Sequence, residues 1–264
     1  MQRLASIATL ISSLELLARR ELHEPGHLMS WEVGQLRSSH YVRGRRGRLI
    51  SRLMALPAFR ALLGLRVGAS AALLLRASGV GRLRFAVAAS SIATTMRSPF
   101  GWDGADQMSA LTFSGLTVAS WLPELRPDVR RFFAYQLCLS YLASGAAKAV
   151  APEWRSGAAL TGIFSTKMYG DERVYRLLRE RPVVAKYGSR AVIAAECSFP
   201  LVLVAPPPIR RCALAGGLLF HGIAALTMNL NTFFWSFAAA YPALEGHCRA
   251  KEQRASPRSR VNRK

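Results

Sequence analysis

Three ionisable side chains interrupt stretches of the chain that are otherwise apolar. They are Lys148 in GAAKAV, Glu196 in AAECSFPLV and His221 in LLFHGIAALTM. A charged side chain at the centre of a bilayer costs about 2.5–3.5 kcal/mol on the most lenient insertion scales, so an intramembrane lysine indicates a functional site by default. Burial disfavours the ammonium form and lowers the pKa of a lysine, which would let Lys148 act as a base near neutral pH. We therefore predict an acid/base constellation of these three residues.

Each of the three residues also has a structural interpretation. Lys148 lies near the end of its apolar stretch, where a long side chain can snorkel its ammonium to the lipid headgroups. Glu196 and His221 could instead form hydrogen bonds between neighbouring helices. Close pairing with Glu196 would stabilise the charged form of Lys148. A tight pair therefore favours a structural role, and a separated pair favours catalysis.

The stretch that carries Lys148 places small and hydroxyl-bearing residues on the same side of a helix. Tyr141, Ser144 and Gly145 precede Lys148 by seven, four and three positions, so all of them share one helical face. Such residues allow a neighbouring helix or a ligand to approach closely.

The composition indicates a membrane protein. Hydrophobic residues make up 51% of the 264 residues, and they are concentrated in runs. A formal net charge of +21 would suggest a nucleic-acid partner in a soluble protein. Here the charge lies in loops and tails between apolar runs, which fits anionic lipid headgroups better. We expect an all-α, polytopic transmembrane helical bundle in the cell membrane, with lipids and not nucleic acid as partners.

About seven apolar runs could supply the helices of this bundle. They cover residues 53–75, 85–96, 109–122, 133–157, 191–205, 212–228 and 232–244, and the fourth stops as a helix at Pro152. The run 85–96 is shorter than the roughly 20 residues that cross a 30 Å hydrocarbon core, so we expect it to be short or re-entrant. The predicted number of membrane helices is six to seven.

Two further features are predicted along the chain. A surface helix is expected over residues 171–190. A kink is expected at Pro200, where it would open a cavity just after Glu196.

The sequence divides into three regions: a lead-in, a transmembrane domain and a tail. Residues 1–56 form a basic lead-in with apolar residues at helical spacing, expected to lie on the membrane or against the bundle. No acidic residue occurs between Glu32 and Asp103, which places the N-terminus on the cytoplasmic side. Residues 57–246 form the transmembrane domain, and residues 247–264 are predicted to be a basic, disordered tail.

The remaining polar groups predict no metal site. The chain contains four cysteines, Cys138, Cys197, Cys212 and Cys248. Their spacings match no zinc framework, so we expect them to be buried small hydrophobic residues. Asp103 and Asp106 lie in a polar connection and are expected to be solvated or to form turns, with a site role as the alternative. Asn229 and Asn231 are expected to form a turn.

The order of these motifs resembles the HTTM membrane domain family, which includes the membrane part of vitamin K-dependent gamma-glutamyl carboxylase. The resemblance spans roughly residues 60–245. The segments that carry it are Arg97-Ser-Pro-Phe, Tyr141-Leu-Ala-Ser-Gly-Ala-Ala-Lys148 followed by Trp154 and Gly157, Glu196 with Phe199-Pro200, Phe220-His221, and Asn231-Thr-Phe233. The spacing from the lysine to the tryptophan is not that of the carboxylase.

The resemblance implies a function for the constellation. Lys148 matches the lysine regarded in the carboxylase as the base that deprotonates vitamin K hydroquinone, and His221 matches the family's Phe-His position. A reduced, vitamin K-like quinone is therefore the implied cofactor. The residues implied to contact it are Tyr141, Gly145 and Trp154. The large extramembrane domain that engages peptides in the carboxylase is missing, so another subunit would have to present a peptide or protein substrate.

Two functions are compatible with these residues. The first is a carboxylase- or epoxidase-like enzyme that acts on a quinone-type lipid, with Lys148 as base and with His221 and Glu196 nearby. The second is a non-enzymatic membrane accessory protein for the maturation or export of a partner peptide, in which the same residues hold helices together. Convergence of the three side chains on one cavity would favour the enzyme.

Overall fold

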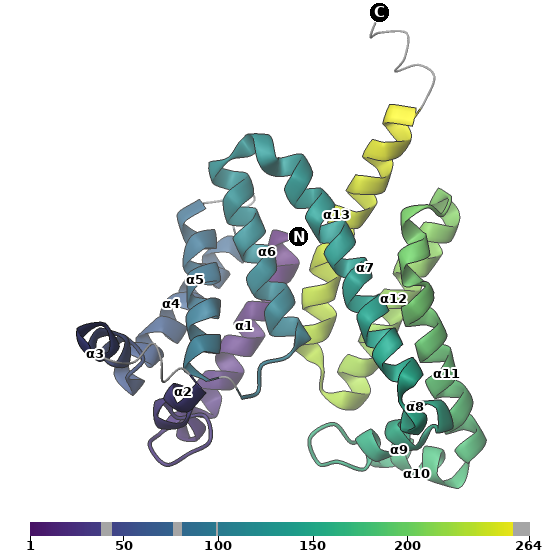
Figure 1. Ribbon diagram of the computed structural model, residues 1–264, viewed down its shortest axis with the longest axis horizontal. Coiled ribbons are helices and arrows are strands. Elements are labelled where there is room, and N and C mark those ends of the chain that lie inside the picture. Colours follow the sequence, from purple (N-terminus) through teal and green to yellow (C-terminus); the bar gives the residue numbers. More distant parts are fainter. Residues whose placement is uncertain (38–43, 76–80, 99, 256–264) are drawn as a thin grey trace, which may run out of the picture. The chain divides into compact units, whose positions relative to one another are not determined.

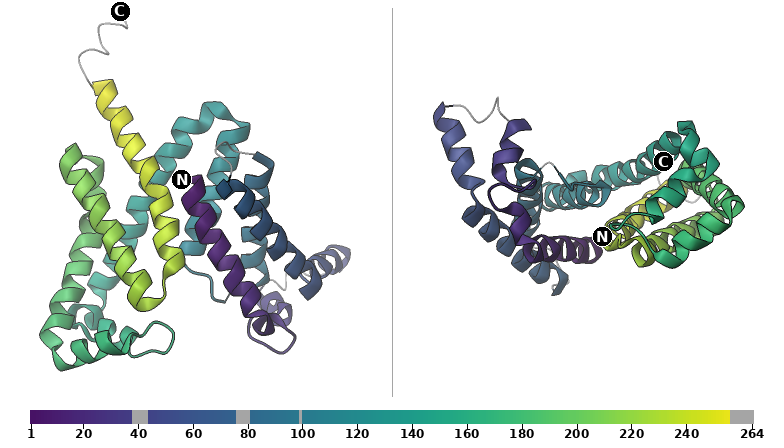
Figure 2. Two further views of the ribbon diagram at one scale, coloured as in Figure 1. Left: turned by 180° about the vertical axis from the view of Figure 1, so that it is seen from behind. Right: turned by 90° about the horizontal axis from the view of Figure 1, so that it is seen from below.

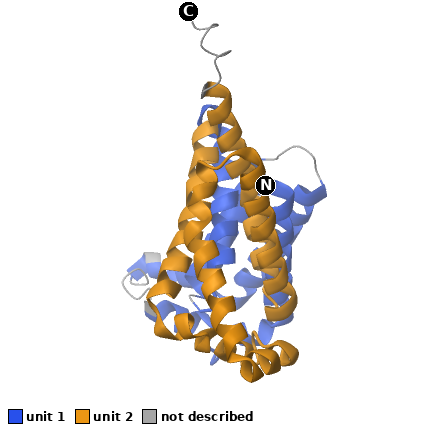
Figure 3. Ribbon diagram, turned by 90° about the vertical axis from the view of Figure 1, so that its right-hand side faces the viewer, with its two compact units in different colours: residues 1–126 blue, residues 127–264 orange. Residues whose placement is uncertain are grey.

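The computed structural model describes residues 1–37, 44–75, 81–98 and 100–255. Within these ranges the chain forms helices and turns and has no strand, so the predicted all-α class is confirmed (Figure 1). The chain divides into two compact units, Met1–Arg126 and Pro127–Lys264, and each unit packs its own helices together (Figure 3).

Unit 1 is a layered group of helices formed by the first half of the chain. Its elements are α1 (Gln2–Ala18), η1 (Arg20–His23), α2 (Trp31–Arg37), α3 (Gly44–Leu53), α4 (Leu56–Leu75), α5 (Gly81–Arg97), α6 (Gly104–Trp121) and η2 (Pro123–Leu125). Helix α1 packs against α4 and α6, and α5 lies between α4 and α6 (Figure 2). Asp103 caps α6, because its carboxylate accepts hydrogen bonds from the amides of Ala105 and Asp106. This agrees with the turn-forming role expected for Asp103.

Small and hydroxyl-bearing side chains line the interior of unit 1. The buried residues of α1 are Ala5, Ser6, Ala8, Thr9 and Ser13. Thr9 Oγ1 is 2.8 Å from Ser70 Oγ of α4, a hydrogen bond between two buried hydroxyls. The leucines and isoleucines of α1 are half-buried or exposed. Helix α1 therefore lies against the bundle, which was one of the two expected positions, and small residues rather than leucines make the contact.

A buried arginine ties the lead-in to α5. Arg97 is 1% exposed and donates hydrogen bonds to three backbone carbonyls, those of Met54 at 3.0 Å, Met29 at 2.9 Å and His23 at 3.1 Å. Its guanidinium also lies 4.2 Å from the ring centroid of Phe59. The planar guanidinium can serve several acceptors at once, which suits it to such a junction.

Unit 2 contains the helix that carries Lys148. Its elements are α7 (Arg126–Val150), α8 (Pro152–Ser156), α9 (Ala158–Phe164), α10 (Glu172–Glu180), α11 (Pro182–Ser198), η3 (Phe199–Leu203), α12 (Pro207–Met228) and α13 (Asn231–Ala255). The short helices α8, α9 and α10 gather against α11, and α12 packs on α13 (Figure 1). Asn229 ends α12 in the left-handed conformation, with φ of 56°, which agrees with the expected turn.

Prolines set several boundaries that differ from the predicted ones. The lysine helix ends at Val150, just before Pro152, as expected, but it begins earlier than residue 133. Pro182 starts a new helix, so only residues 172–180 form the surface helix expected over 171–190. Pro200 lies in the 3₁₀ helix after α11, so it accompanies the end of α11 instead of kinking it.

The C-terminal stretch is more ordered than predicted over part of its length. Helix α13 continues to Ala255, so residues 247–255 are helical where disorder was expected. Residues 256–264 lie outside the described part of the chain.

Two helices of the described chain, α4 and α12, are long and apolar enough to cross a membrane. Only 33% of the most apolar stretch of α4 and 11% of that of α12 are buried, unlike the core helix of a soluble protein. The other runs expected to cross give helices that are short, such as the 17-residue α5 and α11, or that include charged ends, such as α7 and α13.

Candidate functional site

A cavity of about 340 Å³ in unit 2 brings together most of the predicted site residues. Lys148 and Tyr141 line it from α7, Trp154 from α8, Glu196 from α11 and His221 from α12. Five side chains from four helices therefore converge on one space. Aromatic and aliphatic side chains form much of the remaining wall, among them Leu160, Ile163, Val192, Phe220, Phe233 and Phe237.

Lys148 and Glu196 form a tight ion pair at this cavity. The Nζ of Lys148 lies 2.7 Å from Glu196 Oε2 and 3.0 Å from Oε1, and the two side chains are 18% and 8% exposed. Ser144 joins the pair, because its hydroxyl donates to Glu196 Oε1 at 3.3 Å and accepts from Lys148. The carboxylate stabilises the ammonium, and such tightness favours a structural role for the two charges. The ammonium is directed to Glu196 and not to a distant headgroup.

Trp154 covers the ammonium from another side. The indole ring centroid lies 5.1 Å from Lys148 Nζ, within the range of a cation–π contact. The backbone of Trp154 is fixed to α11, since Ser189 Oγ donates to its carbonyl at 2.6 Å. Gly157 follows α8 with φ of 90°, and a Cβ atom there would lie 2.5 Å from the amide nitrogen of Lys186 in α11. Only glycine fits this close approach.

Gly145 does not line the cavity, although it was expected to contact a ligand. A Cβ atom at Gly145 would lie 2.8 Å from both the backbone nitrogen and the Sγ of Cys197, and 2.9 Å from Cβ of Glu196. Gly145 therefore marks a point where α7 and α11 approach closely next to the ion pair. Its role is to bring Glu196 within reach of Lys148.

Tyr141 links His221 to a second tyrosine. The Tyr141 hydroxyl lies 2.8 Å from His221 Nε2 and 2.6 Å from the hydroxyl of Tyr241, and all three residues are buried. The ring of Tyr141 stacks on Phe199 with centroids 3.9 Å apart. Sequence reasoning missed Tyr241. The available signal was a tyrosine within the apolar run 232–244, because a buried tyrosine hydroxyl needs a hydrogen-bond partner.

A second cavity of about 520 Å³ adjoins the first. The two cavities share Tyr141, Val192, Glu196 and Phe220 as wall residues. The second cavity is mostly apolar and is bordered by η3. A cavity therefore lies at the end of α11, but the predicted kink at Pro200 does not open it.

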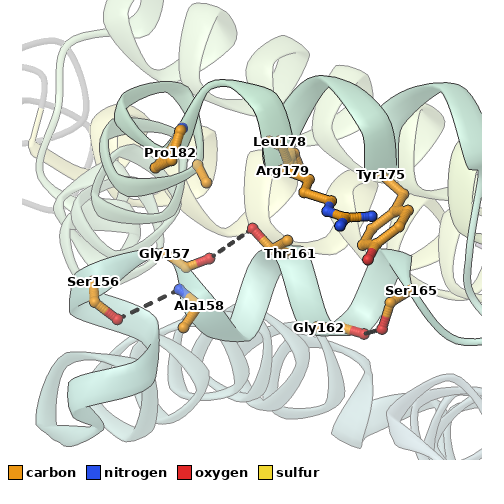
Figure 4. Close-up of a pocket in the computed structure, with 11 residues that line it drawn as sticks. Ser156, Gly157, Ala158, Thr161, Gly162, Ser165, Tyr175, Leu178, Arg179 and Pro182 are labelled. Carbon is orange, nitrogen blue, oxygen red and sulfur yellow. Dashed lines mark hydrogen bonds between the residues drawn. The ribbon is translucent and has the colours of Figure 1, made fainter.

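A third pocket lies on the other side of α9 and carries little chemistry. The hydroxyl groups of its serines and threonine are engaged in local backbone hydrogen bonds (Figure 4): Ser156 Oγ accepts from the amide of Ala158, Thr161 donates to the carbonyl of Gly157, and Ser165 donates to that of Gly162. Leu160 and Ile163 of the same helix face the lysine cavity. Helix α9 is therefore a wall between this pocket and the lysine cavity.

The cysteines of the chain are all free. Cys138 and Cys248 are buried as expected, whereas Cys197 is half-buried and Cys212 is exposed. Cys212 contradicts the expected burial, because its position on α12 lies on the outward face of a helix that is mostly exposed. Among the described residues, no three His, Cys, Asp or Glu side chains are grouped closely enough to hold a metal ion.

Comparison of the chain with protein-family models, with curated proteins and with solved structures finds no match.

Proposed function

We propose that the chain is a multi-pass membrane protein whose unit 2 cavity binds a reduced quinone-type lipid and removes a proton from it, so that molecular oxygen adds to the anion and the products are the quinone epoxide and water. The observation that carries this proposal is the convergence of Lys148, Glu196, His221, Tyr141 and Trp154 on one largely apolar cavity. The HTTM-like identity, the six to seven crossings and the cytoplasmic N-terminus are parts of the same proposal.

The distribution of side chains supports a membrane setting. Large apolar side chains point outward from α12, with Leu226 86%, Leu219 65% and Ile223 52% exposed. Hydroxyl-bearing residues such as Thr9 and Ser70 are buried in unit 1. Small and polar residues inside with large apolar residues outside are typical of helices packed in lipid. The net charge of +21 would be neutralised by anionic headgroups at the membrane surface.

The cavity has the features that a reduced quinone requires. Aromatic walls from Phe233, Phe237 and Trp154 suit a planar ring, while the Lys148–Glu196 pair and His221 offer polar contacts to ring oxygens. Glu196 would accept the proton of a hydroxyl group, and the adjacent ammonium of Lys148 would stabilise the negative charge left on that oxygen. The ion pair thus acts as the base as a unit, and Lys148 holds the charge in place.

The test adds a reduced naphthoquinone and oxygen to the purified protein in detergent and follows quinone epoxide formation. We expect turnover by the wild type and its loss in Lys148→Ala. The matched control is Lys167→Ala, because Lys167 is exposed and lies outside the cavity. Turnover by Lys148→Ala at the wild-type rate would refute the proposed role of the pair.

A second function is favoured by the tightness of the Lys148–Glu196 pair. A bridge of 2.7 Å between α7 and α11 can serve to hold helices together in an accessory protein that matures or exports a partner peptide. If the wild type turns over no quinone, while breaking the pair in Glu196→Leu lowers the unfolding midpoint, the accessory function is preferred.

A further inference from the structure

A chain of three hydrogen-bonding side chains ends at the lysine cavity. It runs from Tyr241 on α13 through Tyr141 on α7 to His221 on α12. We propose that the two tyrosines hold His221 as the neutral tautomer whose Nδ1–H faces the cavity and binds an acceptor oxygen of the ligand. The choice of a quinone as that ligand rests on the proposed function, whereas the tautomer rests on geometry alone.

The direction of the hydrogen bonds follows from counting hydrogens. Among the described residues, the only hydrogen-bond partner of the Tyr241 hydroxyl is Tyr141. If Tyr241 donates to Tyr141 and Tyr141 donates to His221 Nε2, every hydroxyl hydrogen has an acceptor. In the opposite direction, the hydroxyl hydrogen of the buried Tyr241 would be left without one, which is the costlier arrangement. Nε2 of His221 is therefore the acceptor, and the ring proton resides on Nδ1.

The Nδ1 atom of His221 is the one left for a ligand. His221 is 6% exposed, it lines the cavity, and no described residue makes a hydrogen bond to Nδ1. Its ring stacks on Phe237 with centroids 4.6 Å apart, which fixes the plane of the imidazole. A ring N–H at a cavity wall that has no protein partner can donate its hydrogen bond to a ligand or to water.

Gly217 makes this meeting of three helices possible. It lies one turn before His221 on α12, and a Cβ atom there would lie 2.2 Å from the Tyr241 hydroxyl and 3.2 Å from the Tyr141 hydroxyl. No side chain fits at 2.2 Å, so the two hydroxyls occupy the space that a side chain would fill. The neighbouring Gly216 has nothing within 4 Å of its Cβ position.

The cavity therefore offers two separate polar contacts within apolar walls. His221 donates through Nδ1–H, and the Lys148–Glu196 pair provides a cation and a carboxylate. A planar ring with two oxygens, one as acceptor for His221 and one at the ion pair, matches this arrangement. This assigns Tyr241 and Tyr141 as positioning residues, since they act on the ligand through His221.

The tautomer is tested by ¹⁵N NMR of the full chain labelled at histidine in detergent at pH 7.5. We expect a protonated Nδ1 and an unprotonated Nε2 for His221, assigned by the signals lost in His221→Asn. A protonated Nε2, or an imidazolium, would overturn the inference. In Tyr241→Phe, His221 Nε2 is the only acceptor left for the Tyr141 hydroxyl, so the same tautomer is expected. In Tyr141→Phe, Nε2 loses its donor, so a mixture of tautomers is expected. Tyr187→Phe, an exposed tyrosine on α11, should leave the spectrum unchanged.

Alanine substitutions at Gly217 and Gly216 give a second test of the three-residue chain. Gly217→Ala should displace Tyr241 and shift the His221 signals, whereas Gly216→Ala should leave them in place. Equal spectra for the two variants would count against the three-residue chain.

The role toward a ligand is tested with menadiol, the reduced form of menadione, whose binding in the absence of oxygen is followed by quenching of tryptophan fluorescence. We expect the dissociation constant to rise about tenfold in Tyr141→Phe, which removes the donor to His221 Nε2, and to stay unchanged in Tyr187→Phe. Unchanged binding in Tyr141→Phe would refute the positioning role. Absence of menadiol binding by the wild type, with the expected tautomer present, would refute the quinone assignment and leave the tautomer standing.

Discussion

Each of the two units buries a cation on an apolar helix, but the surroundings differ. In unit 1, Arg66 is 3% exposed and donates to the hydroxyls of Ser13 at 2.6 Å and Thr94 at 3.4 Å. In unit 2, Lys148 pairs with the carboxylate of Glu196 and lines a cavity. Burial of a charge alone therefore does not identify a site. Lys148 differs from Arg66 in having a carboxylate partner and in lining a cavity with other polar side chains, whereas the hydrogen-bond partners of Arg66 are hydroxyls.

Replacing Lys148 and replacing Arg66 should differ most in their effect on quinone turnover. Lys148→Met should lower quinone turnover at least 100-fold, because removing one group that stabilises the charge developing on a reacting oxygen costs about 10²–10³ in rate. Arg66→Met should leave turnover per folded molecule within about twofold. The measurement is epoxide formation, normalised to the monodisperse fraction in size-exclusion chromatography. Equal losses in both variants would remove the distinction between the two sites.

Single and double substitutions in the Lys148–Glu196 pair should separate its effect on stability from its effect on activity. Glu196→Leu leaves the Lys148 ammonium buried and unpaired, which should lower the free energy of unfolding by about 3–5 kcal/mol. The double variant Lys148→Met/Glu196→Leu removes both charges and should recover most of this loss while remaining inactive. Thermal unfolding in detergent measures the stability of the two variants, and epoxide formation measures their activity. A double variant as unstable as the single one would show that packing, and not charge, causes the loss.

Glycine-to-alanine substitutions in the two units should change the free energy of unfolding in opposite directions. Gly145→Ala in α7 forces a Cβ atom to 2.8 Å from Cys197 and should destabilise unit 2 by about 1–3 kcal/mol. Gly64 in α4 has nothing within 4 Å of its Cβ position, so Gly64→Ala should stabilise unit 1 by about 0.5–1 kcal/mol. Unfolding midpoints of the two variants give the signs, and a stabilising Gly145→Ala would contradict the close contact of α7 with α11.

The smallest expected effect concerns pH and belongs to unit 1. Burial, and secondarily the charge of Arg97, lowers the pKa of His23 from its ordinary 6.5. The unfolded chain then binds a proton more readily, so the contribution of His23 is complete above about pH 6.5 and declines as the pH falls. The slope is at most about 1.4 kcal/mol per pH unit. His23→Phe should flatten the difference in unfolding midpoint between pH 7 and pH 5, and an unchanged difference would contradict this role.

The sequence predicted the helical class and the residues that meet at the cavity. Lys148, Glu196 and His221 were recognisable because each is an ionisable group within an apolar run, and Tyr141 and Trp154 belong to the same motif. The proline at 152 and the asparagine at 229 marked helix ends correctly. These are local signals, and local signals can be read from neighbouring residues alone.

The pairings across helices could not be predicted. The distance from Lys148 to Glu196 decides between two roles, yet it depends on how closely α7 approaches α11 at Gly145. Tyr241 was missed because its importance arises from a contact with Tyr141, 100 positions away in the chain. Helical periodicity was misleading for α1, where the small residues and not the leucines are buried.

The anchoring of Trp154 has a consequence for the lysine. Helix α11 carries Glu196 and, through Ser189, also holds the backbone of Trp154. One rigid helix thus supplies the carboxylate on one side of the ammonium and steadies the indole on the other. A rotation of α11 that withdrew Glu196 would also loosen the tryptophan, so Lys148 changes from enclosed to accessible in a single movement.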